Sequence, residues 1–167
     1  MKTSEKSIKI CKILYIEDNN ADTRLIKELL LEDSDQNFEV ISREKLVGGL
    51  DYLKRNKVDV ILLDLSLPDS SENTTFEKVK SIALNIPIII LTGSSLQRES
   101  LRQCLDSADG YLVKGEIDSS SLISAIKQAI QKTNTTKDSH NVKTCTYSST
   151  RNYIKDKFKP TWDLTQQ

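Results

Sequence analysis

The chain contains 167 residues, of which 37% are hydrophobic and 29% are charged. This composition predicts one globular domain with a substantial core, and it excludes a fibre or a wholly disordered chain. The longest apolar runs, Ile61–Leu63 and Ile86–Leu91, are far shorter than the roughly 18 residues that a membrane-spanning helix requires. The charged start, Met1–Lys6, is not followed by the apolar region of a secretory signal. We therefore expect a cytoplasmic protein without a membrane span.

The net charge is zero, but it is distributed unevenly. Residues 1–130 carry 17 Lys and Arg against 21 Asp and Glu, a net charge of −4, whereas residues 131–167 carry 7 against 3, a net charge of +4. The three cysteines, Cys11, Cys104 and Cys145, are widely spaced, and His140 is the only histidine. This pattern argues against a disulfide framework, a zinc site and a Ser-His-Asp triad. The sequence predicts an acidic body followed by a basic tail.

Five extended runs are rich in Ile, Val and Leu, and apolar residues do not alternate with polar ones along them. Continuous apolar runs of this length are typical of strands that are buried on both faces of a parallel sheet. The predicted strands cover Ile10–Ile16, Phe38–Ser42, Val58–Leu63, Pro87–Leu91 and Tyr111–Val113.

After each predicted strand, apolar residues recur every three or four positions, which is the period of an amphipathic helix. The five stripes are Ala21, Leu25 and Leu29; Leu46, Leu50 and Leu53; Phe76, Val79 and Ala83; Leu101, Leu105 and Ala108; and Leu122, Ile126, Ala129 and Ile130. Parallel strands need right-handed crossovers that place helices on both faces of the sheet. The sequence therefore predicts an α/β, doubly wound fold, in which ligands bind at the carboxyl ends of the strands.

The chain divides into three predicted parts. Residues 1–8 form an N-terminal extension, residues 9–131 the folded domain, and residues 132–167 a polar, basic tail. Ser149 or Thr150 could cap a short docking helix near residues 150–159, which Pro160 would end. The tail therefore has two interpretations: a disordered extension, or a docking segment whose apolar residues are Tyr153, Ile154, Phe158 and Trp162.

Polar side chains stand where the predicted strands end. The first strand ends at Glu17 and Asp18, the third at Asp64, the fourth at Thr92 and the fifth at Lys114. Each residue alone has an ordinary explanation, such as a helix cap, a loop carboxylate or a solvated surface charge. Together they are harder to explain, because three converging carboxylates repel one another unless a cation relieves the repulsion.

Oxygen ligands favour a hard cation such as Mg²⁺, which proteins commonly hold with one or two carboxylates, water and phosphate oxygens. A hydroxyl from Thr92 and an ammonium from Lys114 suit a tetrahedral anion such as a phosphoryl group. The residues at the strand ends therefore predict phosphoryl transfer to an aspartate.

The same residues resemble the receiver domain of two-component response regulators. The motifs are Glu17-Asp18, the segment from Val60 through Asp64 to Pro68, Leu91-Thr92-Gly93, and Tyr111-Leu112-Val113-Lys114. The resemblance covers about residues 9–131. It implies a (βα)5 fold, with five helices around a five-stranded parallel sheet of strand order 2-1-3-4-5.

The resemblance also implies a role for each residue. Asp64 would accept the phosphoryl group from a sensor histidine kinase. Mg²⁺, or Mn²⁺ as a substitute, would be bound by Asp18, Asp64 and the backbone carbonyl of Ser66, with Glu17 acting through a water molecule. Thr92 and Lys114 would contact phosphoryl oxygens, and Tyr111 would be the switch aromatic, unless it is simply a half-buried strand residue.

Partners are expected from the same resemblance. A downstream protein or a second copy would contact residues 95–131, and the 36 residues after Gln131 are too few for a DNA-binding domain.

Gly115 stands where the family usually has proline, and Glu72 where it often has glycine, so that both turns are expected to differ. Ser66 and Ser94 replace longer side chains that orient water in other receivers, and we expect slow autodephosphorylation.

Two alternatives come from other classes of protein. A receiver-like module could bind partners without being phosphorylated. A Mg²⁺-dependent phosphatase that resembles haloacid dehalogenases would need a second aspartate two residues after its nucleophile, and Asp64-Leu65-Ser66 lacks it. We therefore do not expect an enzyme that turns over a separate substrate.

Overall fold

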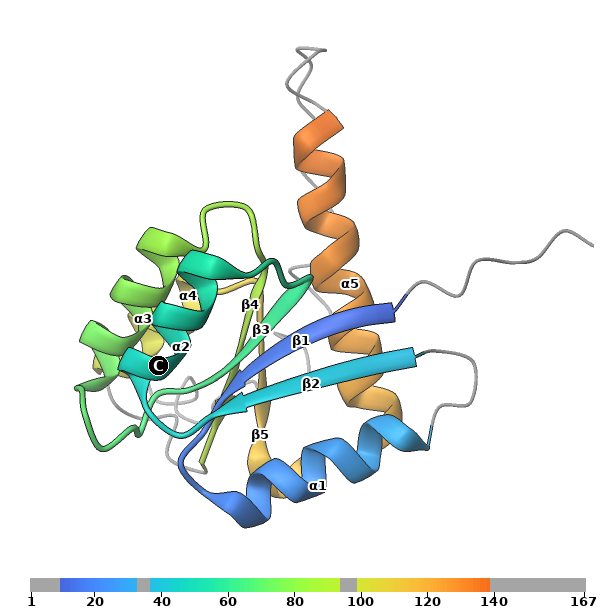
Figure 1. Cartoon of the computed structure of the whole chain (residues 1–167), viewed down its shortest axis with the longest axis horizontal. Helices are drawn as coiled ribbons and strands as arrows, with labels where there is room; N and C mark the ends of the chain where they lie inside the picture. Colours follow the sequence, from blue (N-terminus) through green and yellow to red (C-terminus); the bar gives the residue numbers. More distant parts are fainter. Residues whose placement is uncertain (1–9, 33–36, 94–98, 139–167) are drawn as a thin grey trace, which may run out of the picture. The chain divides into compact units, whose positions relative to one another are not determined.

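The computed structural model describes residues 10–32, 37–93 and 99–138. Strands and helices alternate along the chain (Figure 1) in the order β1 (Ile10–Ile16), α1 (Asn20–Leu31), β2 (Asn37–Arg43), α2 (Leu46–Arg55), β3 (Val60–Asp64), α3 (Glu72–Ile82), β4 (Ile88–Thr92), α4 (Glu99–Ser107), β5 (Gly110–Val113), the short 3-10 helix η1 (Lys114–Glu116) and α5 (Ser119–Asp138). The predicted strands begin and end within two residues of the observed ones. The docking helix expected near residues 150–159 lies outside the described residues.

The five strands form one parallel sheet of order β2-β1-β3-β4-β5. This order confirms the expected doubly wound fold. The strand order reverses between β1 and β3, which is the place where α/β folds of this type bind ligands.

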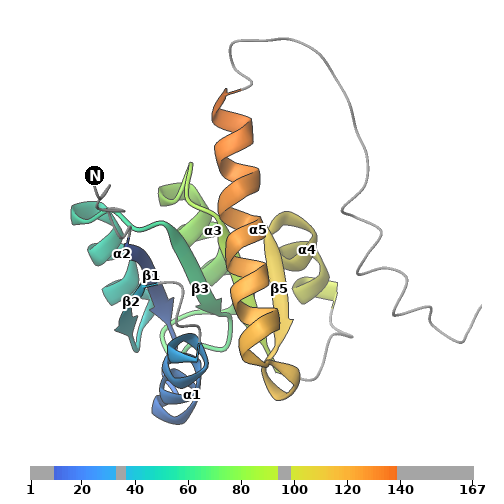
Figure 2. The same cartoon turned by 90° about the vertical axis from the view of Figure 1, so that its right-hand side faces the viewer.

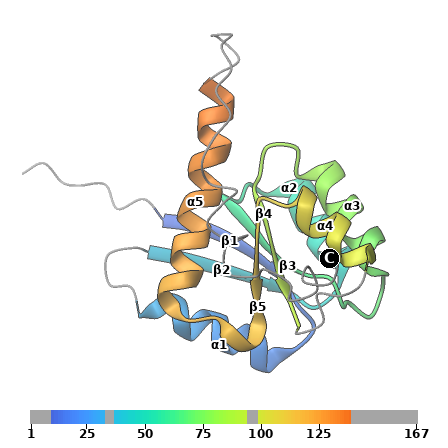
Figure 3. The same cartoon turned by 180° about the vertical axis from the view of Figure 1, so that it is seen from behind.

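Side chains of the central strands alternate between two cores. On β3, Ile61 and Leu63 point toward the face covered by α2, α3 and α4, whereas Val60 and Leu62 point toward the face covered by α1 and α5. Figures 1 and 3 show these helices on opposite sides of the sheet. Strands β3 and β4 are buried throughout, as predicted, but the edge strands β2 and β5 are partly exposed, because each has a neighbour on one side only.

Helix α1 turns a different face to the sheet from the one predicted. Its buried residues are Thr23, Ile26 and Leu30, while Leu25 is 42% exposed. The helix begins directly after Asn19, whose side-chain oxygen accepts a hydrogen bond from the Ala21 N–H at 2.9 Å. Because three leucines follow one another at residues 29–31, the apolar period alone does not select one face.

Helix α5 continues past Gln131, where the predicted folded domain ends, to Asp138. The Thr133 hydroxyl donates to the Ala129 carbonyl at 3.1 Å, and the Thr135 hydroxyl donates to the Lys132 carbonyl at 2.8 Å. These last turns extend beyond the sheet (Figure 2), and none of residues 132–135 is buried. Among the described residues, no helix is long and apolar enough to cross a membrane.

The loop that follows β3 is tied to the start of α2. The Asp69 carboxylate accepts hydrogen bonds from the Leu46 N–H at 2.9 Å and the Val47 N–H at 3.1 Å. Slight burial favours the neutral carboxyl, but these N–H groups outweigh it and lower the pKa of Asp69. Asp69 therefore caps a helix that begins 23 residues earlier and whose own cap residue, Lys45, supplies no side-chain bond.

Two adjacent glycines in α2 have different surroundings. A Cβ atom on Gly49 would clash with Cδ1 of Ile16 and would lie 2.9 Å from its Cγ1, so that only glycine lets α2 approach β1 this closely. A Cβ atom on Gly48 would meet only the Arg43 side chain, at an ordinary distance of 3.5 Å.

We expect Gly49→Ala to lower the free energy of unfolding by about 1–3 kcal/mol, because the added methyl group overpacks the contact with Ile16. Gly48→Ala is the matched control, and it should raise stability by about 0.5–1 kcal/mol through its helix propensity. Urea unfolding of both variants tests the pair. Equal stabilisation by the two substitutions would contradict the close approach.

Candidate functional site

The carboxyl ends of four strands meet at one edge of the sheet. Glu17 and Asp18 follow β1, Asp64 ends β3, Thr92 ends β4 and Lys114 follows β5. The register places Asp64 beside Leu91 and Thr92 beside Val113, so that neighbouring strands end together. The residues predicted from the strand ends are therefore brought to a common edge.

Three of these residues form an acidic cluster. Glu17, Asp18 and Asp64 each offer one carboxylate oxygen, and these oxygens lie within 4.8 Å of one another. Glu17 and Asp64 are buried, whereas Asp18 is exposed. An all-oxygen, anionic donor set of this spacing fits a hard divalent cation such as Mg²⁺.

The Lys114 ammonium group lies among three carboxylates. It donates hydrogen bonds to Glu17 Oε2 at 2.5 Å and to Asp22 Oδ2 at 3.0 Å, and it lies 3.2 Å from Asp64 Oδ2. Burial would lower the pKa of Lys114, but the hydrogen bond to Glu17 and the charge of Asp64 outweigh it and raise that pKa above its ordinary value. The lysine is therefore held in its charged form.

Glu17 is held in place by residues on both sides of it in sequence. Its Oε2 atom accepts a hydrogen bond from the Tyr15 hydroxyl at 2.8 Å, and its Oε1 atom accepts one from the Asn19 N–H at 3.0 Å. Tyr15 is fully buried in the α1–α5 core. Burial, followed by the negative charge of Glu17, raises the pKa of the Tyr15 hydroxyl.

The remaining predicted residues surround this centre. The Thr92 hydroxyl is buried and donates to the Gly93 carbonyl at 3.1 Å. Tyr111 is partly buried on β5 and packs against the core beneath α2, α3 and α4. The Ser66 N–H donates to Asp64 Oδ1 at 3.2 Å, and the Ser66 side chain is exposed. Ser94 lies outside the described residues.

The structure describes both residues at which the resemblance leads us to expect unusual turns. Gly115 lies in η1, which begins at Lys114, and a Cβ atom there would meet nothing within 4 Å. Glu72 is the first residue of α3, and Ser71 is its cap residue. Neither change removes a chemical group from the acidic edge.

Sequence reasoning missed Tyr15 and Asp22. A weak signal exists for both. Tyr15 on β1 precedes Glu17, which directly follows the strand, by two residues, the spacing that puts side chains on the same face of an extended chain. Asp22 stands in the first turn of the helix after the acidic pair. Their roles depend on distances across the fold, since Asp22 and Lys114 are 92 residues apart in sequence.

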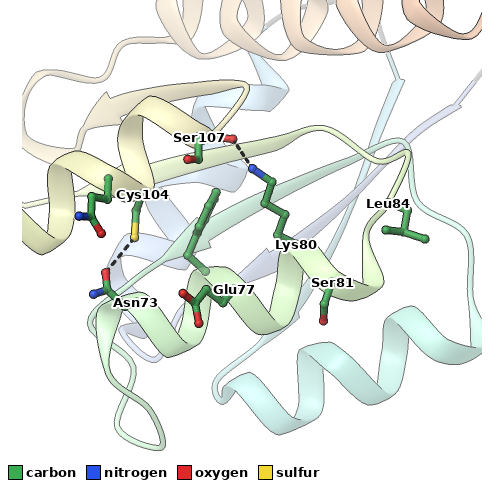
Figure 4. Close-up of a pocket in the computed structure, with 9 residues that line it drawn as sticks. Asn73, Glu77, Lys80, Ser81, Leu84, Cys104 and Ser107 are labelled. Atoms are coloured by element: carbon green, nitrogen blue, oxygen red, sulfur yellow. Dashed lines mark hydrogen bonds between the residues drawn. The ribbon is translucent and has the colours of Figure 1, made fainter.

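A separate hollow of about 520 Å³ lies between α3 and α4 (Figure 4). Lys80 Nζ donates to the Ser107 carbonyl at 3.0 Å, and the Cys104 thiol donates to Asn73 Oδ1 at 3.4 Å. Burial, followed by the charges of Glu72 and Glu77, raises the pKa of the Cys104 thiol, which disfavours its thiolate form. These two hydrogen bonds hold α3 against α4.

We expect the protein to lose stability above about pH 10. The pKa values of Tyr15 and Lys114 in the folded chain lie above their ordinary values of 10.0 and 10.5. Their contribution to stability is complete below these ordinary values and is lost as the pH rises toward the folded-state values. Urea unfolding across this range measures the loss.

Tyrosinate absorbance should show one tyrosine that ionises only as the chain unfolds. Tyr15→Phe should remove that delayed ionisation and leave that of the other tyrosines unchanged. Tyr52→Phe, which changes a partly buried tyrosine on α2, is the control and should retain it. Ionisation of all tyrosines before any unfolding would contradict the buried hydrogen bond to Glu17.

Known proteins share this fold and these motifs. The model of the response regulator receiver domain family matches residues 13–127. The cell cycle transcriptional regulator CtrA of Caulobacter vibrioides is 35% identical over 103 residues, and the cell cycle response regulator CtrA of Brucella ovis is 32% identical over 103 residues. Each match covers 62% of this chain and 43% of the relative, so that the chain matches less than half the length of these relatives.

Solved structures agree with the family match. A response regulator receiver domain protein from Clostridium thermocellum is 28% identical, with a TM-score of 0.64, over 75% of this chain and 98% of that one. The receiver domain of the sensor histidine kinase PA1611 from Pseudomonas aeruginosa PAO1, which has a magnesium ion in its active site cleft, is 24% identical, with a TM-score of 0.63, over 74% and 99%. Because the family match spans most of the chain and coincides with the five-stranded parallel sheet, this protein belongs to the response regulator receiver domain family.

Proposed function

We propose that this protein is a response regulator that accepts a phosphoryl group on Asp64 from a sensor histidine kinase. The observation that carries the proposal is the position of Asp64, which shares the acidic cluster with Glu17 and Asp18 and lies 3.2 Å from the Lys114 ammonium group. A nucleophile, a cation site and a fixed positive charge are the parts that phosphoryl transfer requires.

The cofactor in this proposal is Mg²⁺, for which Mn²⁺ could substitute. Asp18 and Asp64 would bind it through carboxylate oxygens and Ser66 through its backbone carbonyl, while Glu17 would act through a water molecule. When bound, the cation offsets the negative charge of the incoming phosphoryl group. The donor set fits, because it consists of oxygen atoms with excess negative charge.

The residues of the chain itself supply the nucleophile and the electrostatics. A carboxylate oxygen of Asp64 attacks the phosphorus atom, the phosphorus–nitrogen bond of the kinase phosphohistidine breaks, and the nitrogen keeps the electron pair. The product is an acyl phosphate on Asp64. The Ser66 N–H, 3.2 Å from Asp64 Oδ1, orients the carboxylate, and Lys114 stabilises charge on a phosphoryl oxygen.

Phosphorylation would act as a switch. The Thr92 hydroxyl now donates to the Gly93 carbonyl, and it would turn to a phosphoryl oxygen once the group is attached. Tyr111 would then move further inward. About two added negative charges at Asp64 bias an equilibrium between two states, and the surface that changes would be residues 95–131, for contact with a downstream protein or a second copy.

We further propose that the chain turns over no separate substrate. Ser66 stands where a phosphatase of the haloacid dehalogenase type needs a second carboxylate, so that the site lacks a general acid there. Slow hydrolysis of its own acyl phosphate would be its only further reaction. We also propose that the chain acts in the cytoplasm, where a sensor histidine kinase would supply the phosphoryl group.

Intact mass after incubation with acetyl phosphate and Mg²⁺ tests the acceptor. We expect a gain of about 80 Da, one phosphoryl group on an aspartate nucleophile, that is lost in Asp64→Ala and in EDTA. Asp51→Ala removes an exposed aspartate on α2 and is the matched control that should retain the gain. No gain from acetyl phosphate or from a histidine kinase would instead support a module that works without phosphorylation.

Mg²⁺ affinity, measured by titration calorimetry, tests the cation site. Asp18→Asn should weaken binding about tenfold or more, because it removes an exposed anionic ligand without disturbing the core. Glu28→Gln removes an exposed charge from the outer side of α1 and should leave the affinity within twofold of the original chain. Equal weakening by both would assign the effect to net charge rather than to ligation.

A further inference from the structure

Lys114 contacts more carboxylates than its proposed role, binding a phosphoryl oxygen, requires. Its hydrogen bonds go to Glu17 and Asp22, while Asp64, the proposed acceptor, faces it at 3.2 Å. The pair with Asp22 joins the first turn of α1 to the end of β5 across 92 residues of sequence. Asp22 is outside the acidic cluster formed by Glu17, Asp18 and Asp64.

We propose that Asp22 is a positioning residue that competes with the phosphoryl group for Lys114 and thereby sets how readily this receiver enters its phosphorylated state. This inference rests on the proposed function, because it concerns the same lysine and the same acceptor. Its basis is the geometry of Asp22 in the resting structure.

The start of α1 fixes the position of Asp22. The Asn19 side chain caps the helix through the Ala21 N–H at 2.9 Å, and the Asn19 N–H is itself bonded to Glu17 Oε1 at 3.0 Å. Asp22 Oδ2 is thereby held 3.0 Å from Lys114 Nζ. The helix dipole favours an acidic residue anywhere in the first turn of α1. It does not explain why this residue contacts a lysine of another element.

The donors of Lys114 are limited. An ammonium group has three N–H donors, and here it faces three carboxylates. A phosphoryl group on Asp64 adds about two negative charges and new acceptor oxygens. The N–H that faces Asp64 can pass to a phosphoryl oxygen, but that oxygen lies beyond the carboxylate, so that Lys114 must shift toward it and weaken its contacts with Glu17 and Asp22.

Asp22 is the partner that is most easily released. Its side chain is 31% exposed, whereas that of Glu17 is 1% exposed. Water can replace the ammonium group at Asp22, but loss of a partner at Glu17 would leave buried charge less well compensated. The Asp22 contact thus stabilises the resting position of Lys114 and opposes its move to the phosphoryl group.

Binding of beryllofluoride, a phosphoryl mimic, to the full chain in saturating Mg²⁺ tests the competition. We expect Asp22→Asn to bind it about fivefold more tightly by fluorine NMR titration, the change typical of one partly exposed ion pair. Asp22→Glu restores the charge and should return the affinity toward that of the original chain. Glu28→Gln, which removes a charge from the same helix, should stay within twofold.

A merely structural role would give a different result. If Asp22 only supported α1, Asp22→Asn would lower the stability measured by urea unfolding and would leave beryllofluoride affinity unchanged or weaker, which would overturn the inference. Equal tightening by Glu28→Gln would overturn it as well. An original chain that neither binds beryllofluoride nor accepts phosphoryl would remove the proposed function and this inference with it, whereas normal binding without the Asp22 effect would remove the inference alone.

Discussion

The acidic edge of the sheet depends on the ammonium group of Lys114. Four carboxylates, those of Glu17, Asp18, Asp22 and Asp64, gather where the strands end, and Lys114 contacts three of them. Without that positive charge, the two buried carboxylates would repel each other in a poorly hydrated space. With it, excess negative charge still remains, and this excess makes the same edge suitable for a divalent cation.

The sheet makes this arrangement possible because its central strands are apolar except at their carboxyl ends. Strands β3 and β4 are buried throughout, so their polar side chains are confined to the carboxyl ends, at Asp64 and Thr92. Helix α2 approaches β1 closely at Gly49, and Asp69 ties the loop after Asp64 to the start of the same helix. The apolar core thereby fixes the strand ends that carry the acceptor.

The sequence was sufficient to predict features set by local pattern. Apolar runs located the strands, and the parallel topology then placed Asp18 and Asp64 at one edge. The sequence was insufficient to predict the buried face of a helix where one pattern fits several faces. In α1, the consecutive leucines at residues 29–31 fit more than one buried face. It was also insufficient for Asp22, because its contact with Lys114 depends on how distant elements pack.

The restraint of Glu17 favours an indirect role in cation binding. Its Oε1 atom already accepts a hydrogen bond from the Asn19 N–H, and its Oε2 atom accepts bonds from both Tyr15 and Lys114. A cation bound directly to Glu17 would compete with these donors, two of which, Tyr15 and Asn19, lie two residues from it in sequence. Exposed Asp18 has greater freedom to adjust. In the proposed site, a cation that Glu17 held through a water molecule would leave the Tyr15–Glu17–Lys114 hydrogen bonds intact.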